Sequence, residues 1–400
     1  MFGFIYILDM IFSSILLLTK KISVKWKAIL IGVIFGTLGL MMTPRNGNFS
    51  DVVRFFNELN SFRLEISLSS FSDVFNYLIH SSTGGTANDA VAQYSSVPVM
   101  GVVMMIMSYL KNGWLLFLTA FIDISSASYL VISSTHKYLH YQVENYDVRA
   151  WLIFSCLFNF NATIGGIRNG VIGCIFILVF WSILDENKES IFIKLTILTL
   201  VLSLVHPFTL VIYLLAIIAI FCYKHNYLMF IFEIILLCQH FYQPILLNHL
   251  NSLGGGAFLE SLSFKSTQYF GSSAYIGAAS QFSIVRDTMR VFLFICIIFF
   301  VRYNSKTTNY YQKYNAFTDL FISLSIGAYT DQIFFSRCSL IMTIVLIPYL
   351  VRLIYIFNNN TNKLLPVLSK YLFNFLLLIS LVDNLRAGTR FFSLTLNNII

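Results

Sequence analysis

The chain has 400 residues, of which 57% are hydrophobic, 16% aromatic and only 11% charged, and its mean hydropathy is +0.76. This composition excludes a soluble multidomain protein, whose surface would need far more charge. The net charge of +8 does not indicate a nucleic-acid partner, since no basic block with interleaved aromatic residues lies outside the apolar runs. The composition predicts a polytopic membrane protein.

Apolar runs recur along the whole chain without the alternation that marks membrane-spanning strands. In lipid the backbone must satisfy its own hydrogen bonds, which a helix does within a single segment. The sequence therefore predicts an all-α fold, with one transmembrane domain over residues 1–400 and about twelve transmembrane helices. The first run lacks a basic leader and a cleavage site, so we expect it to be a retained span. The expected spans are residues 2–18, 27–43, 114–132, 151–166, 169–184, 191–205, 208–222, 227–247, 288–302, 316–334, 338–357 and 366–386.

Two longer stretches, about residues 44–113 and 248–287, interrupt this pattern. Within the first, residues 97–110 are short for a span and carry an early proline, so we expect an interfacial or re-entrant segment. If that segment does not cross, twelve of the fifteen basic residues on one side are lysines, whereas nine of the eleven on the other are arginines. The positive-inside rule then places the lysine-rich loops in the cytoplasm, and both termini and both long stretches outside.

No metal site, cofactor site or disulfide framework is expected. The six cysteines lie in or beside apolar runs, with no C-x-x-C spacing and no neighbouring histidines. His136 and His140 are four residues apart but have no acidic ligand close by. No Walker, G-x-G-x-x-G or G-x-S-x-G motif follows a strand, so nucleotide-driven and serine-esterase chemistry lack support.

The arginines of the outer side are the first candidates for a functional site. The positive-inside rule gives them no targeting role there, and a guanidinium matches a phosphate or carboxylate in its plane and stays charged in a partly dry cavity. An anionic substrate is therefore expected. The structural alternative is that these side chains reach lipid headgroups or pair with acids such as Asp287 and Asp331.

Two of the candidates lie early in the chain. Asp51, Arg54, Phe55 and Glu58 follow the spacing of one face of an amphipathic helix. Asp51 is a candidate base or sugar-binding acid, and Arg54 a candidate substrate-binding residue. Arg168, in NATIGGIRNGVIGCIFILVF, stands beside two adjacent glycines between two apolar runs, where a charge is costly unless it is paired or faces a wet cavity. The glycines also allow close approach of a ligand or another backbone.

The remaining candidates lie in later outer turns. His206, in LVHPF, can act as a general base or donate a hydrogen bond to a phosphate, or it can cap a helix end. Arg337 is again a lone arginine between two apolar runs, with Asp331 as the alternative structural partner. Arg286 and Arg290 share one helical face and either clamp a second phosphate or mark the start of a helix.

The order of these motifs resembles that of a known family. A basic turn after the first span is followed by GNFSDVVRFF, a Pro-Val-Met amphipathic segment, GGIRNGVIGCIFILVF, LVHPFTL and FSRCSLIMTIVLIPYL. In order and spacing, over most of the chain, they resemble the EpsG-like branch of the Wzy polysaccharide polymerases. The resemblance implies a membrane glycosyltransferase that joins undecaprenyl-diphosphate-linked oligosaccharide repeat units. The product would be O-antigen, capsule or exopolysaccharide, made on the outer face of the bacterial cytoplasmic (inner) membrane.

The resemblance also implies roles for individual residues. Asp51 matches the acid of the family's first motif, although Phe55 replaces the usual tyrosine, and Arg168 matches its arginine, followed here by Asn169 where glutamine is common. The histidine and arginine of later outer turns match His206 and Arg337. The expected catalytic residues are thus Asp51, Arg168, His206 and Arg337.

In the implied reaction, Arg168 and Arg337 stabilise the diphosphate leaving group, and His206 or Asp51 deprotonates the acceptor hydroxyl. The expected substrate-binding residues are Arg54, Arg286 and Arg290, the last two at the second lipid carrier. No metal and no cofactor are required. The expected partners are the lipid bilayer, the lipid-linked oligosaccharides and, as candidates, a chain-length regulator and a flippase of the same pathway.

Two other functions remain as alternatives. A lipid-linked oligosaccharide flippase or transporter must expose its cationic site to both sides in turn, whereas these arginines gather on one side. A membrane acyltransferase that modifies surface glycan would favour a histidine with a nearby acid facing a cytoplasmic acyl donor. His206, expected on the outer side, fits that description poorly.

Overall fold

The computed structural model describes residues 1–45, 51–80, 91, 94, 97–139, 145–239, 241–242, 281–304, 309–359 and 364–395. These residues are mostly helical, in agreement with the predicted all-α fold class. The helices of the first half are α1 (Phe2–Leu18), α2 (Val24–Met41), α3 (Asp51–Leu68), α4 (Phe71–His80), α5 (Pro98–Ser108), α6 (Gly113–Leu139), α7 (Tyr146–Leu157), α8 (Phe160–Gly165), α9 (Ile167–Ile183) and α10 (Lys188–Ser203). Those of the second half are α11 (Phe208–Cys222), α12 (Asn226–Leu237), α16 (Gln281–Tyr303), α17 (Asn309–Gly327), α18 (Gln332–Val345), α19 (Ile347–Asn359) and α20 (Leu364–Phe391).

Most expected spans correspond to one helix, but two of them are broken. The span expected over residues 151–166 is divided between α7 and α8. The span expected over residues 338–357 is divided between α18 and α19, which are bent by 50° relative to each other. The span expected over residues 227–247 begins with α12. Its residues 240 and 243–247 lie outside the described residues.

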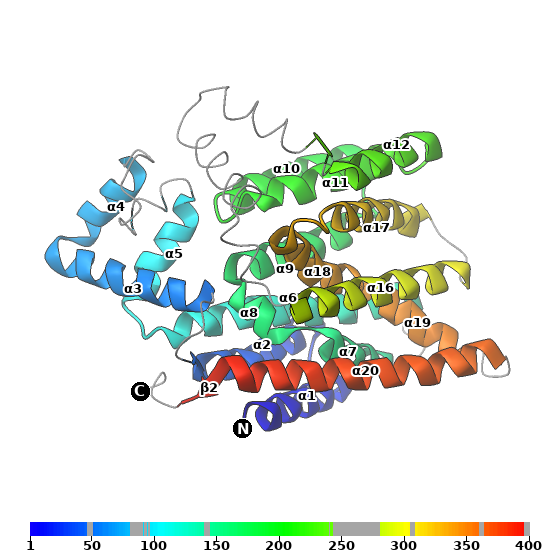
Figure 1. Cartoon of the computed structure of the whole chain (residues 1–400), viewed down its shortest axis with the longest axis horizontal. Coiled ribbons are helices and arrows are strands. Elements are labelled where there is room, and N and C mark those ends of the chain that lie inside the picture. Colours follow the sequence, from blue (N-terminus) through cyan, green and yellow to red (C-terminus); the bar gives the residue numbers. More distant parts are fainter. Residues whose placement is uncertain are drawn as a thin grey trace.

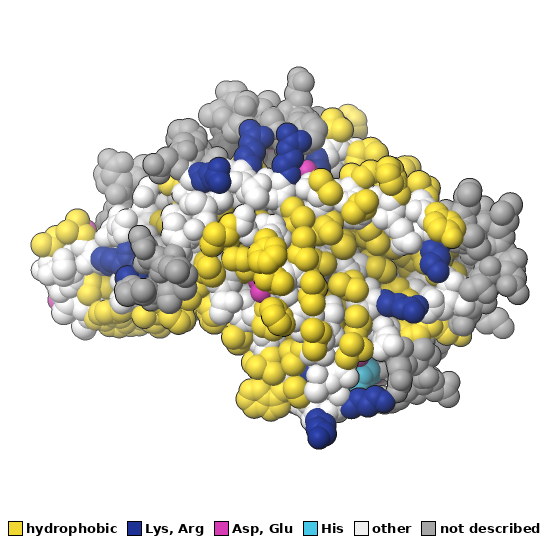
Figure 2. Space-filling model, turned by 90° about the horizontal axis from the view of Figure 1, so that it is seen from below, with side chains coloured by type: hydrophobic (Ala, Val, Ile, Leu, Met, Phe, Trp, Pro, Cys, Tyr) yellow, Lys and Arg dark blue, Asp and Glu magenta, His cyan; other side chains and the backbone are white. Residues whose placement is uncertain are grey.

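The apolar helices indicate a membrane protein. Among the described residues, three helices are long and apolar enough to cross a bilayer, namely α2, the Gly113–Lys137 part of α6 and the Lys370–Phe391 part of α20, and the bent pair α18–α19 could be a fourth span. Figure 2 shows hydrophobic side chains over the middle of one face of the molecule, with lysine and arginine side chains towards its margins. Several other apolar helices are shorter than the roughly 20 residues of a straight span.

Helices α3, α4 and α5 form a lobe at one end of a bundle in which most other helices run along the long axis (Figure 1). Arg63 of α3 closes the lobe by donating hydrogen bonds to the carbonyls of Ser108, at 2.9 Å, and Leu110. Helix α5, which covers the expected interfacial segment, packs against α3 and α4. Large hydrophobic side chains of the lobe are exposed at Leu64, Leu68, Phe71, Tyr77, Ile79, Ile106, Tyr109 and Leu110.

A pair of short strands joins the segment after α2 to the segment after α20. Strands β1 (Met42–Pro44) and β2 (Phe392–Leu394) are antiparallel, with Met42 opposite Leu394 and Pro44 opposite Phe392. Because β1 directly follows α2 and β2 directly follows α20, the pairing fixes the ends of two helices that are remote in sequence. Both helices therefore terminate at the same end of the bundle (Figure 1).

The α2–α6 pair is closely packed because glycines of α2 face α6. Atoms added as a Cβ at Gly32 or Gly39 would lie 2.8 Å from the carbonyl oxygen of Phe121 and 2.7 Å from that of Leu116, respectively. Small residues that let two backbones approach are the usual device for packing helices in a membrane. The glycines of the second apolar run thus position α6.

Replacing Gly39 by alanine is expected to destabilise the protein. The new side chain would overlap the α6 backbone, and overpacking of this kind costs about 1–3 kcal/mol. We expect a lower melting temperature for the purified protein in detergent. Gly3→Ala is the matched control, because the nearest atom to its added Cβ is 3.5 Å away on a Leu385 side chain. Equal melting temperatures for the two variants would contradict this packing.

Candidate functional site

The short helix α8 lies at the centre of the candidate site, between two breaks in the backbone. Asn159 begins it, with the side-chain Oδ1 accepting a hydrogen bond from the amide of Ala162 at 3.3 Å, a standard helix cap. The ring of Phe160 holds the helix in the core, with ring centroids 5.6 Å from Tyr6 and 5.7 Å from Phe35. Among the described residues, no atom lies within 4 Å of a Cβ added at Gly165, its last residue.

Close packing on two sides fixes the start of α9, and with it Arg168. A Cβ at Gly170 would lie 2.5 Å from Oδ2 of Asp123 on α6, and one at Gly173 would lie 2.9 Å from Ile341 on α18. The glycines of the IRNGVIG motif thus let α6 and α18 approach α9. Phe180 near the end of α9 stacks on Tyr314, whose hydroxyl donates to the carbonyl of Val345 at the end of α18. The two helices therefore run in the same direction, and Arg337 lies towards the same end of the bundle as Arg168.

A first group of polar residues, the α3–α9 cluster, consists of Arg54, Phe55, Glu58, Tyr94 and Arg168. The guanidinium carbons of Arg54 and Arg168 lie 5.0 and 5.4 Å from the centroid of the same ring, that of buried Phe55. Nε of Arg54 is 3.5 Å from Oε1 of Glu58. The hydroxyl of Tyr94 donates a hydrogen bond to Oε2 of Glu58. The lobe thereby brings an acid, a phenol and a second arginine to Arg168.

The electrostatics of the α3–α9 cluster favour an anionic ligand. The cluster holds two guanidinium groups and one carboxylate, that of Glu58, whose side chain is only 10% exposed. Burial raises the pKa of Tyr94 well above its ordinary value, and the carboxylate of Glu58 raises it further, against the opposing effect of Arg168. Tyr94 therefore stays protonated and keeps donating to Glu58. Aromatic contact holds both guanidinium groups in place without neutralising them.

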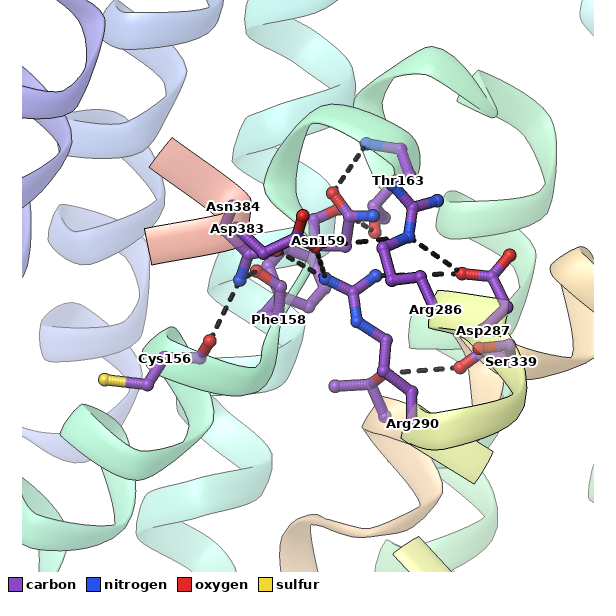
Figure 3. A network of polar contacts seen from close by, with 12 residues as sticks. Cys156, Phe158, Asn159, Thr163, Arg286, Asp287, Arg290, Ser339, Asp383 and Asn384 are labelled. Carbon is purple, nitrogen blue, oxygen red and sulfur yellow. Dashed lines mark hydrogen bonds and ion pairs between the residues drawn. The ribbon is translucent and has the colours of Figure 1, made fainter. Parts of the chain in front are cut away.

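A second group, the α16–α20 cluster, consists of Arg286, Asp287, Arg290, Asp383 and Asn384 (Figure 3). Nη2 of Arg290 lies 3.2 Å from Oδ2 of Asp383 and donates to Oδ1 of Asn384 at 2.7 Å. Nε of Arg286 lies 3.2 Å from Oδ1 of Asp287 and 4.0 Å from Asp383. The two arginines do share a face of α16, and two acids, Asp287 of α16 and Asp383 of α20, match their formal charge.

Asn384 connects this cluster to the break before α8. Its Nδ2 donates to the carbonyls of Cys156 at 2.9 Å and Phe158 at 3.0 Å, and its own carbonyl accepts a hydrogen bond from Nδ2 of Asn161 at 3.1 Å. These bonds satisfy carbonyl groups that the end of α7 leaves without helical partners. Since α8 packs against both α3 and α20, the two clusters flank α8.

Replacing Asn384 by alanine is expected to lower the stability of the protein markedly. The change removes the side-chain donor of the Cys156 carbonyl, leaves the Phe158 carbonyl with only the amide of Phe160, and leaves Arg290 with only its acidic partners. An unsatisfied buried group costs about 1–3 kcal/mol. Thermal unfolding in detergent measures the loss. Asn304→Ala is the control, because exposed Asn304 directly follows α16 and, among the described residues, its side chain donates only to the carbonyl of Phe300. An Asn384→Ala protein as stable as this control would exclude the anchoring role.

His206 has a clear local role in the structure. Its Nδ1 accepts a hydrogen bond from the amide of Phe208 at 3.1 Å, and its carbonyl accepts one from the hydroxyl of Thr209 at 2.8 Å. The residue is buried in the turn between α10 and α11. The Phe208 ring lies edge-on to that of Phe334, with centroids 5.3 Å apart. This geometry favours the helix-capping interpretation, and a catalytic role for His206 stays a prediction.

The other predicted residues differ in how much the structure says of them. Arg337 is half-buried on α18, while Oδ1 of Asp331 accepts a hydrogen bond from the amide of Phe334 at 3.1 Å and so caps that helix. Asp51 begins α3, but its side chain lies outside the described residues. The α3–α9 cluster brings Arg54 and Arg168 together, and the α16–α20 cluster brings Arg286 and Arg290 together. Neither cluster, as defined above, includes His206 or Arg337.

Sequence reasoning missed three residues of the two clusters and used a fourth only as part of a pattern. Glu58 counted there as one position of an amphipathic face, and Tyr94 lies in a polar stretch without periodicity. Asp383 and Asn384 are adjacent polar residues inside an expected span, LVDNLR. Polar residues inside a span are costly in lipid and mark functional or paired sites. The pair Asp383 and Asn384 was therefore the one sequence signal that could have indicated the α16–α20 cluster.

The geometry suits the binding of two anions at one end of the bundle. Each cluster offers two arginines, with one acid in the α3–α9 cluster and two in the α16–α20 cluster, and α8 lies between them. Among the described residues, no group of three or more histidine, cysteine, aspartate or glutamate side chains could hold a metal ion. No family model, curated protein or solved structure matches this chain.

Proposed function

We propose that the protein is a membrane glycosyltransferase that polymerises undecaprenyl-diphosphate-linked oligosaccharide repeat units on the outer face of the bacterial cytoplasmic membrane. The observation that carries the proposal is the pair of arginine clusters flanking α8 at one end of the bundle. A reaction between two lipid-linked repeat units brings two diphosphates to the same membrane surface. Two sites that each hold two arginines, on either side of one short helix, meet that requirement.

The α3–α9 cluster has the groups that glycosyl transfer needs. The acceptor hydroxyl oxygen forms a bond to the anomeric carbon of the donor sugar, and the bond from that carbon to the diphosphate oxygen breaks. The electron pair leaves with the diphosphate, whose growing charge Arg168 and Arg54 stabilise. The hydroxyl proton passes to Glu58, whose orientation Tyr94 sets. We prefer Glu58 to His206 as the base because Nδ1 of His206 already accepts a backbone hydrogen bond.

The proposed topology has about twelve spans, with the lobe outside and the shorter helices tilted or in locally thinned bilayer. Ion pairs at the opposite end of the bundle support it. Nζ of Lys137 is 2.7 Å from Oδ2 of Asp185, and Lys194 is 2.6 Å from Oε1 of Glu186. Lys313 donates to the carbonyl of Leu184 at 2.8 Å. Lysines gather there and arginines gather around α8, as the positive-inside rule predicts for a cytoplasmic and an outer face.

Deletion of the gene in the source bacterium tests the proposed function. A polymerase predicts that the deletion strain loses the polysaccharide ladder on a gel, and that single repeat units on lipid carriers accumulate in the outer leaflet. The restored wild-type gene is expected to bring the ladder back. Repeat units trapped in the cytoplasmic leaflet would identify a flippase instead. An unchanged ladder would overturn both functions.

A further inference from the structure

A deep apolar groove runs between α16 and α20, with α19 as its floor. Its volume is about 760 Å³, within the range of about 300–1,000 Å³ typical of ligand sites. We call it the α16–α20 groove. Cys296 and Ile297 of α16, Leu353 of α19, and Leu376 and Ile379 of α20 are among its apolar lining residues.

One end of the groove is closed and apolar. The ring centroid of Phe357 lies 5.7 Å from that of Phe300 and 6.1 Å from that of Phe373, so three helices meet there through aromatic side chains. Arg286, at the other end, and Phe300 are about 20 Å apart along α16 at about 1.5 Å per residue. The groove is thus long enough to take a lipid chain through a large part of one bilayer, whose hydrocarbon core is about 30 Å thick.

The other end of the groove is cationic. Arg286, Arg290 and Arg386 line it together with a single acid, Asp383. Arg290 is held by Asp383 and Asn384, and Arg286 by Asp287. Arg386 is exposed, and its guanidinium makes no ion pair with any residue that the structure describes. A cation at the mouth of an apolar groove complements an anionic headgroup at the end of an apolar chain.

We propose that the α16–α20 groove binds a polyprenyl phosphate, with the isoprenoid chain in the groove and the phosphate at Arg386 and Arg286. The choice of this lipid rests on the proposed function. Continuity with the candidate site supports it, because Asp383 at the mouth adjoins Asn384, which bonds to the break before α8. A headgroup at this mouth lies at the edge of the α16–α20 cluster. The groove thus holds one of the two lipid carriers, and Arg386 is a further residue that recognises its phosphate.

Binding of undecaprenyl phosphate to the purified full-length protein in detergent tests this assignment, with native mass spectrometry as the readout. Cys296→Trp fills the groove, and Phe299→Trp is its control because Phe299 is 63% exposed and is not a lining residue. Arg386→Glu reverses the charge at the mouth, and Arg390→Glu is its control on the next turn. We expect Cys296→Trp and Arg386→Glu to raise the Kd by about tenfold or more and both controls to stay within about twofold.

Three competitors distinguish the possible occupants. Undecaprenol, which lacks the phosphate, inorganic phosphate, which lacks the chain, and phosphatidylglycerol are each expected to displace undecaprenyl phosphate poorly. Equal displacement by phosphatidylglycerol would show a groove for bulk phospholipid and overturn the proposal. Wild-type affinity in both Cys296→Trp and Arg386→Glu would also overturn it, and using two variants guards against one that fails to fold.

This experiment and the gene deletion can fail independently. If undecaprenyl phosphate binds in the groove but deletion leaves the polysaccharide ladder unchanged, the groove assignment stands and the polymerase proposal fails. If deletion abolishes the ladder but the groove variants bind undecaprenyl phosphate normally, the polymerase proposal stands and the groove assignment fails.

Discussion

Replacing Arg168 by lysine is expected to abolish long polymer, although the positive charge remains. A guanidinium can hold two phosphate oxygens in one plane, whereas an ammonium is a point charge that cannot keep this orientation. Loss of one preorganised donor at a developing charge lowers a rate by about 10²–10³. The measurement is the polysaccharide ladder in a deletion strain that expresses the variant, compared with one that expresses the wild-type gene.

A control variant and a stability measurement make this result specific to Arg168. Arg45→Lys is the matched control, because Arg45 is an exposed arginine near the same end of the bundle whose described contact is a backbone hydrogen bond to the carbonyl of Phe391. The melting temperature of Arg168→Lys should stay close to that of the wild type, since a partly exposed cation–π contact contributes only about 0.5–1 kcal/mol. A normal ladder from Arg168→Lys at normal protein levels would remove Arg168 from the reaction.

Replacing Glu58 by glutamine is expected to reduce glycosyl transfer by about 10²–10⁴, the usual contribution of a general base. Glutamine has the same shape, and its amide oxygen can still accept the hydrogen bond from Tyr94, so the fold should be retained. It cannot take up the acceptor proton. The initial rate of polymerisation by purified protein supplied with lipid-linked repeat units measures the loss.

The pH profile separates a catalytic role of Glu58 from a structural one. The wild-type rate should fall at acidic pH, where the base becomes protonated, and this limb should be absent from the residual activity of Glu58→Gln. Tyr94→Phe should keep the acidic limb with a smaller loss of rate, because it removes only the group that orients Glu58. Glu65→Gln, at an exposed position of the same helix, should behave as the wild type. An acidic limb that persists in Glu58→Gln would assign the base elsewhere.

Much of the helical architecture follows from local sequence. The expected spans 2–18 and 208–222 coincide with α1 and α11, because long apolar runs bounded by polar residues have few other ways to satisfy their backbone in lipid. The bend between α18 and α19 also has a local cause. Pro348 lies in the first turn of α19, and proline lacks the amide that would continue the preceding helix.

The break before α8 has no comparable local cause. Residues 151–166 form one apolar run in the sequence, in which Ser155, Asn159, Asn161 and Thr163 are all of a type that can cap a helix. The break is stabilised by Asn384, which bonds to the carbonyls of Cys156 and Phe158 from more than two hundred positions away. Local periodicity carries no information about such a partner.

By itself, the sequence determined that this is a helical membrane protein whose arginines gather in the stretches expected outside, because hydropathy and charge bias act locally and are additive along the chain. Only the tertiary structure decided which polar groups meet. Glu58 pairs with Tyr94 beside Arg168, and Arg290 pairs with Asp383 and Asn384, through contacts between elements that are distant in sequence. Each pairing depends on how helices pack around α8, and packing is a property of the whole bundle rather than of any one segment.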